Sequence, residues 1–132
     1  MDFRPILYVI GLLLFILAIS MNVPMLVDLY FGNDDWVVFF ICIIVTAFFG
    51  GALAFTNAPS DGFKINIRQG FMLTVFSWIS LCIFAAIPFW LSGMDVSFVD
   101  AVFEATSGIT TTGATIMVGL DYAPPGILMW RA

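Results

Sequence analysis

Residues 103–115 read FEATSGITTTGAT, a polar Thr/Gly run that follows long apolar stretches of the chain. Each unpaired peptide group costs several kcal/mol in hydrocarbon, so an open Thr/Gly coil cannot face lipid. Such backbone is tolerated at membrane depth only where it lines a wet cavity or binds something. The simplest ligand for a row of bare carbonyl oxygens is a dehydrated cation.

The composition indicates a membrane protein. Hydrophobic residues make up 62% of the chain and charged residues only 10%, against roughly 25% charged in a soluble domain. Three charge-free stretches, at 5–27, 36–56 and 69–94, are long enough as helices to cross a hydrocarbon core about 30 Å thick. We therefore predict an all-α integral membrane protein of transmembrane helices plus a re-entrant pore helix and an extended filter loop.

The basic residues predict the orientation of the chain. Arg4 precedes the first apolar stretch, and Lys64 and Arg68 lie between the second and the third. Cytoplasmic loops carry an excess of Lys and Arg, so we expect the N-terminus and the 57–68 loop in the cytoplasm.

Acidic residues fall mostly on the other side. Asp28 is expected, with two further aspartates, in an outer loop of residues 28–35, and the segment from about 93 to 124 is also expected outside. The Thr/Gly run then enters from the outer face. The three apolar stretches hold no ionisable Asp, Glu, Lys or Arg, which disfavours the alternative of a secondary transporter with a broken helix.

Two interpretations of the N-terminal stretch are open. Arg4, an apolar run from Ile6 and small residues at 18–20 also fit a signal peptide. The apolar run continues to Leu26, longer than a usual signal core, so a retained helix from about 5 to 28 is favoured.

Small residues recur at a spacing of four in the second stretch. Ala47 pairs with Gly51 in this way, and Gly50 pairs with Ala54. Each pair lies on one helix face, where two backbones can approach closely. This pattern fits a dimer interface or packing within one chain, and the second interpretation is favoured.

No pattern indicates an enzyme or a bound cofactor. The chain has no His, its carboxylates are scattered, and Cys42 and Cys82 sit mid-span as small apolar groups. A phosphate-binding glycine loop is also absent from the sequence. We expect no catalytic residues and no nucleic-acid partner.

The segment before the Thr/Gly run predicts a short helix. Ser97 and Asp100 have the spacing of an N-terminal cap, and Gly108 is placed to end the helix. A helix over 98–108 would be about 16 Å long, half a membrane. Its C-terminal end would direct partial negative charge at the point where a cation loses water.

Residues 109–114 must then return outward as an extended filter. Gly113 permits a backbone twist that a Cβ would strain, and a proline-started helix is expected over about 125–132. The Thr/Gly run alone fits an ordinary exposed loop equally well. Between a capped half-length helix and a new helix, it predicts a re-entrant pore loop.

These residues resemble a known family. FEATSGITTTGA at 103–114 is similar to the first pore loop of the Trk/Ktr/HKT potassium-transporter superfamily, in its bacterial TrkH-type form, and MWRA at 129–132 is similar to the start of the next helix. Such proteins carry two extra N-terminal helices and four helix–pore-loop–helix repeats. The resemblance implies that residues 1–62 supply the two helices and residues 63–132 a truncated first repeat. The helices are expected at about 5–28, 36–56, 68–92, 98–108 and 125–132.

The resemblance also implies function and partners. It implies potassium uptake across the bacterial inner membrane, with K⁺ as the transported ion and no cofactor. The backbone carbonyls of Thr110, Thr111, Thr112 and Gly113 would coordinate K⁺, chiefly at the last three. Implied partners are membrane lipid, three further pore repeats, a second copy in a homodimer and a cytosolic nucleotide-binding TrkA-type regulatory subunit.

One loop supplies a quarter of the ring around the ion. The chain alone is therefore not expected to form a selective pore, and it is either a fragment, the more natural interpretation, or a subunit that assembles. A non-transporting assembly or scaffold fragment remains the other alternative.

Overall fold

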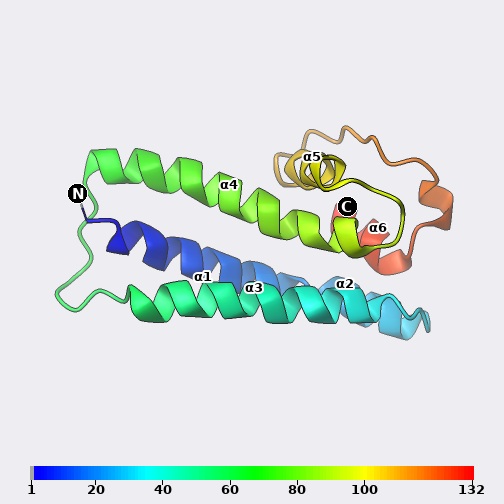
Figure 1. The fold of residues 1–132 in the computed structure, drawn as a ribbon, viewed down its shortest axis with the longest axis horizontal. Coiled ribbons are helices and arrows are strands. Elements are labelled where there is room, and N and C mark those ends of the chain that lie inside the picture. The colour runs from blue at the N-terminus through cyan, green and yellow to red at the C-terminus, as the bar shows by residue number, and fades with distance from the viewer. Residues whose placement is uncertain (1) are drawn as a thin grey trace.

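The computed structural model describes residues 2–132 and is all-helical over that range (Figure 1). Three helical segments, Arg4–Tyr30, Trp36–Thr56 and Ile67–Leu91, are long and apolar enough to cross a membrane. The predicted fold class is confirmed, and the chain is a multi-pass membrane protein. Its elements are α1 (Arg4–Ser20), α2 (Asn22–Tyr30), α3 (Trp36–Thr56), α4 (Ile67–Leu91), α5 (Phe98–Ile109), the 3₁₀ turn η1 (Leu120–Tyr122) and α6 (Pro125–Arg131).

The first expected helix is interrupted at Met21. Pro24 has no N–H for the carbonyl of Ser20, so the regular hydrogen-bond ladder cannot run through this point. The side chain of Asn22 donates instead to the carbonyls of Ala18, at 3.2 Å, and Ile19, at 2.9 Å. These bonds compete with the ladder. The result is two helices, α1 and α2, within one membrane span.

Helices α1 and α3 cross at two glycines. A Cβ on Gly11 would lie 2.7 Å from the carbonyl oxygen of Gly50, and a Cβ on Gly50 would lie 2.8 Å from that of Gly11. Real side chains do not tolerate such distances, so only glycine lets the two backbones touch here. Gly50 therefore packs within the chain, as favoured from the sequence, whereas a Cβ on Gly51 would meet nothing within 4 Å.

The two ends of the bundle differ. At one end lie the N-terminus and the connection from α3 to α4, where Gln69 donates to the backbone oxygen of Asp2 at 2.7 Å (Figure 1). At the other end α5 packs beside α4, and α6 packs against α2. The main core lies at this second end, because Met21 and residues of α3 to α6 bury their apolar side chains there together. Its fully buried members include Met21, Phe39, Ala86, Ala101 and Ile127.

The expected position of Asp28 was wrong. The turn between the first two spans is residues 31–35, and Asp28 lies inside α2 with none of its surface exposed. The helix continues past the acid because a backbone N–H elsewhere in the fold meets the carboxylate. Gly126, in α6, donates to it at 2.6 Å. The first span therefore does contain an ionisable residue, near its end, against the expectation that it had none.

Candidate ion pathway

The short helix α5 begins where the sequence predicts. The side chain of Ser97 accepts a hydrogen bond from the N–H of Asp100 at 3.2 Å. This cap satisfies one of the donors that a helix start leaves open. The helix then runs for 12 residues, about 18 Å. Its buried face includes Ala101 and Ala105, whose small side chains allow α5 to pack closely against α4.

Gly108 does not end α5, which was the expectation. Thr111 takes the left-handed position instead, with φ +57°, and the N–H of Thr112 donates back to the carbonyl of Ser107 at 2.9 Å. This closing bond is typical of helix C-termini that reverse direction. Gly108 faces α6 instead, where a Cβ would lie 3.7 Å from the carbonyl oxygen of Arg131. The strained threonine conformation is held by the bonds around it.

The loop after α5 exposes its backbone. Residues 110–113 are exposed, and within residues 2–132 no protein donor bonds to their carbonyl oxygens. Gly113 has φ +77°, so the backbone twist expected there is present. The next carbonyl, of Ala114, accepts from the hydroxyl of Ser107 at 2.6 Å. The fold thus ties the loop down beside these four carbonyls and leaves the four themselves without a partner.

Glu104 holds the outgoing limb of the loop. Its side chain is only 2% exposed, and one carboxylate oxygen accepts three hydrogen bonds. The donors are the hydroxyl of Thr115 at 2.6 Å, the N–H of Ile116 at 2.7 Å and the N–H of Met117 at 3.1 Å. Hydrogen bonds to a charged acceptor are roughly twice as strong as neutral ones. A single carboxylate on α5 therefore fixes the three residues at which the chain leaves the loop.

Arg131 of α6 meets the other oxygen of the same carboxylate. Its Nε lies 3.4 Å from Glu104 Oε2, and this is the only ion pair among residues 2–132. The helix α5 is not one of the three spanning segments. Burial raises the pKa of Glu104, but the hydrogen bonds from Thr115, Ile116 and Met117, together with Arg131, outweigh it and hold the pKa below its usual value. The carboxylate therefore stays ionised and keeps accepting.

Sequence reasoning gave Glu104 no role. A signal was present, because an ionisable residue inside a short helix that is predicted to re-enter the membrane is a functional candidate by default. The sequence does not reveal which groups bind this carboxylate, because the three donors lie 11 to 13 residues further along the chain.

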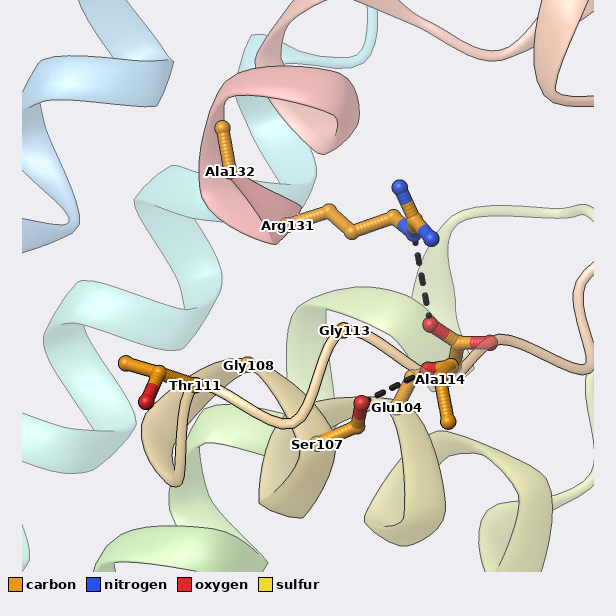
Figure 2. A pocket seen from close by; sticks show the side chains of 8 residues that line it. All are labelled: Glu104, Ser107, Gly108, Thr111, Gly113, Ala114, Arg131 and Ala132. Carbon is orange, nitrogen blue, oxygen red and sulfur yellow. Dashed lines mark hydrogen bonds and ion pairs between the residues drawn. The ribbon is translucent and has the colours of Figure 1, made fainter.

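A hollow of about 320 Å³ lies between the loop and α6 (Figure 2). The Arg131 side chain reaches across it from α6 to Glu104, and the loop passes beneath. No group of three His, Cys, Asp or Glu suited to a metal ion occurs in the described residues 2–132. The oxygen atoms around the hollow are mainly backbone carbonyls and the hydroxyls of Ser107 and Thr111, beside the carboxylate of Glu104. The hollow is lined by Glu104, Ser107, Gly108, Thr111, Gly113, Ala114, Arg131 and Ala132.

Two contacts fix α6 behind the loop. Asp28 accepts from the N–H of Gly126 at its first turn, and a Cβ at position 126 would collide with that carboxylate. At its other end the indole of Trp130 donates to the carbonyl of Ala85 at 3.0 Å. The helix that carries Arg131 is therefore tied to both α2 and α4.

Comparison with known proteins gives the family. Residues 34–132 match the family profile TrkH, described as a cation transport protein. The chain belongs to the TrkH family. A TrkH crystal structure, that of the potassium transporter from Vibrio parahaemolyticus, matches with a TM-score of 0.92 and 36% identity, over 99% of this chain and 28% of that one.

Curated members of the TrkH family agree. The Trk system potassium uptake protein TrkG of Escherichia coli (strain K12) is 35% identical over 130 residues, covering 98% of this chain and 27% of that protein. TrkH of Halomonas elongata is 36% identical over 132 residues, covering 99% and 27%. The chain thus spans little more than a quarter of the length of these relatives.

Proposed function

We propose that this chain supplies the first of four pore loops in a channel-like transporter that takes up potassium. In this proposal the carbonyl oxygens of Thr110, Thr111, Thr112 and Gly113 line the ion path and replace part of the ion's water shell. The three other loops come from further repeats, in the same reading frame or in other subunits. The relatives are potassium uptake proteins of Trk systems, which supports potassium as the ion.

One observation carries the proposal. Four consecutive carbonyls follow a capped half-length helix, and no protein donor in residues 2–132 satisfies them. The loop is nevertheless fixed on both sides, by Ser107 and by Glu104. A solubilising loop has no need of such fixing, whereas an ion site must hold its oxygens in place before the ion arrives. The C-terminal end of α5 adds favourable partial negative charge.

The test of the filter is Gly113→Ser in the full reading frame that contains this chain. A side chain at φ +77° strains the loop backbone and shifts the carbonyls, so discrimination of potassium over sodium should fall about tenfold, or ~1.4 kcal/mol. The measurement is rubidium uptake with sodium competition in cells that lack their own potassium uptake.

Gly119→Ser is the matched control. Gly119 has φ +78°, and a Cβ there would also meet nothing within 4 Å, but the residue lies outside the proposed filter. Both variants carry the same kind of backbone strain. If they shift ion preference equally, or if Gly113→Ser leaves it unchanged at normal expression, this loop does not line the filter.

The proposed orientation has the N-terminus and the α3–α4 connection in the cytoplasm of a bacterial cell, with the chain in its inner membrane. Arg4, Lys64 and Arg68 all lie at that end, in keeping with the excess of basic residues in cytoplasmic loops. In intact cells an impermeant thiol reagent should label Asp34→Cys and spare Ser60→Cys. Background from Cys42 and Cys82 should be small, because both are buried. The reverse labelling would exclude this orientation.

The proposal extends to protein partners. A homodimer of complete subunits, resting on a cytosolic nucleotide-binding regulatory subunit of the TrkA type, would fit a Trk system. The α3–α4 connection, residues 57–66, would then face that subunit. Tagged full-length protein should retain the regulatory subunit through affinity purification, and its loss under mild conditions would count against this partner.

A further inference from the structure

An apolar groove lies between α1 and α3 at the end that holds the N-terminus. Its volume is about 310 Å³, and its lining is almost entirely hydrocarbon or aromatic. The floor is made of small residues of α3, among them Gly51 and Ala54, and the walls of larger side chains such as Phe15 and Phe55. Phe55 is 89% exposed, so it stands out from the bundle rather than packing into it.

The helix crossing explains why the groove stays open. A Cβ on Gly11 would lie 2.7 Å from the carbonyl oxygen of Gly50 and 2.6 Å from the N of Ala54, so the backbones of α1 and α3 are in contact along this face. A Cβ on Gly51 would have no neighbour within 4 Å. The space beside the crossing is therefore not filled by this chain.

A polar hollow of about 330 Å³ continues the groove toward the chain end. Ala58 lines both spaces, and the rings of Tyr8 and Phe63 join them with centroids 6.2 Å apart. Four charged residues line the hollow, two acidic and two basic, so its formal charge is balanced. They are Asp2, Arg4, Asp61 and Lys64.

These four charges are not paired with one another. Among residues 2–132 the only side-chain ion pair joins Arg131 to Glu104, far from this end. Asp2 accepts only the backbone N–H of Arg4, at 3.1 Å. Both signs of charge are therefore available to one ligand that carries both signs itself.

We propose that the groove and the hollow together bind one phospholipid whose headgroup contains a phosphate and a primary ammonium. Arg4 and Lys64 contact the phosphate, and Asp2 and Asp61 accept from the ammonium, which has three N–H donors. One acyl chain lies in the groove along Phe15 and Phe55. A choline headgroup has the same charges but no N–H to donate, and an anionic headgroup brings no cation to the two aspartates.

The binding test uses the full-length protein in detergent and native mass spectrometry. Phosphatidylethanolamine, phosphatidylcholine and phosphatidylglycerol with identical acyl chains are titrated separately. Phosphatidylethanolamine should form a one-lipid adduct at about tenfold lower concentration than phosphatidylcholine, because only it donates hydrogen bonds to the carboxylates. Equal binding of all three lipids would overturn the proposal.

Two sets of variants locate the site. Gly51→Leu fills the groove and should abolish the preferred adduct, whereas Gly70→Leu, at an equally open position on α4, should retain it. Asp2→Asn combined with Asp61→Asn should remove the preference for phosphatidylethanolamine over phosphatidylcholine and leave a weak adduct with both.

Other occupants of the groove give different results. If Gly51→Leu lowers Tm or changes the oligomeric state while its lipid adducts equal those of Gly70→Leu, another protein segment fills the groove and the proposal is wrong. The assay does not depend on ion transport. Failure of the filter proposal would therefore leave this result intact, and the reverse also holds.

Discussion

The α1–α3 crossing and the loop at residues 110–113 hold their backbones in opposite ways. At the crossing, Gly11 and Gly50 contribute no side chain, and carbonyl oxygens of one helix pack against the backbone of the other. In the loop, residues 110–113 are exposed, and the backbone that follows them donates hydrogen bonds to the carboxylate of Glu104. The crossing depends on the absence of side chains at two glycines, whereas the loop depends on a charged hydrogen-bond acceptor.

The difference predicts which changes each region tolerates. Close backbone packing fails when a methyl group is added, because neighbouring helices cannot move apart without losing their other contacts. A polar anchor fails when the acceptor is lost, because buried N–H groups are then left without partners. Adding atoms to the exposed loop, or removing polar atoms from the crossing, should matter much less for stability.

The largest effect is expected for Gly50→Leu. Even a Cβ would lie 2.8 Å from the carbonyl of Gly11 and 2.9 Å from the N of Phe15, so the two helices must separate. Overpacking of this kind costs about 3 kcal/mol or more, enough to remove most folded protein. The yield and Tm of the full-length protein, read by fluorescence-detected size-exclusion chromatography, measure the loss. Gly51→Leu adds the same atoms to open space and should express normally; equal losses would refute the crossing argument.

Glu104→Gln should have the next largest effect. The amide keeps the size of the side chain but is a weaker acceptor for Thr115, Ile116 and Met117, and it gives up the ion pair with Arg131. We expect a loss of about 2–3 kcal/mol, seen as a lower Tm, together with reduced ion uptake. Asp121→Asn removes an exposed acid and should change stability by less than about 0.5 kcal/mol. A Tm for Glu104→Gln equal to that of Asp121→Asn would show that Glu104 is not an anchor.

The contact of Asp28 with Gly126 combines close packing against a glycine with a carboxylate that accepts a backbone hydrogen bond. Gly126→Ala adds a methyl group that collides with the carboxylate, and Asp28→Ala removes the acceptor of the Gly126 N–H. Each change should destabilise the protein by about 1–2 kcal/mol. The double variant should lose less than the sum, because the added methyl then occupies the vacated space. Thermal unfolding of all four proteins completes the cycle, and strict additivity would mean that the two residues do not interact.

The smallest effect, and the only stabilising one, is expected for Thr111→Gly. A β-branched residue at φ +57° is strained, and glycine adopts this conformation without cost from a Cβ. The gain should be at most about 1 kcal/mol, because glycine also loses more entropy on folding. Thr112→Gly, without a positive φ to relieve, serves as the comparison in the same Tm assay. A lower Tm for Thr111→Gly than for Thr112→Gly would show that the threonine side chain stabilises the turn.

The parts of the fold that rest on local patterns were predicted well. Apolar length and the absence of charges gave the spans 36–56 and 69–94; α3 coincides with the first, and α4, at Ile67–Leu91, covers most of the second. The Ser97 cap and the twist at Gly113 also depend only on neighbouring residues, and both are present. The role of the carbonyls at 110–113 as ion ligands stays a prediction.

The errors share one cause, which is a partner distant in the sequence. Asp28 was expected in a loop because an acid inside a span is costly, but its acceptor role toward Gly126, 98 residues away, allows the helix to continue. Gly108 was expected to end α5 because glycine commonly does so, but Thr111 takes the left-handed position, and Gly108 faces α6, where a Cβ would lie 3.7 Å from the carbonyl oxygen of Arg131. Neither partner can be read from local composition.

The sequence by itself determined that this chain spans a membrane, where α3 and α4 lie, and where a short capped helix meets a polar loop. These properties follow from hydropathy and from hydrogen bonds within a few residues, so short stretches of sequence are enough to predict them. Tertiary structure decided which groups fix the loop and α6: Glu104 with Arg131, and Asp28 with Gly126. A buried carboxylate is stable only beside its donors, and only the folded chain brings those donors to it.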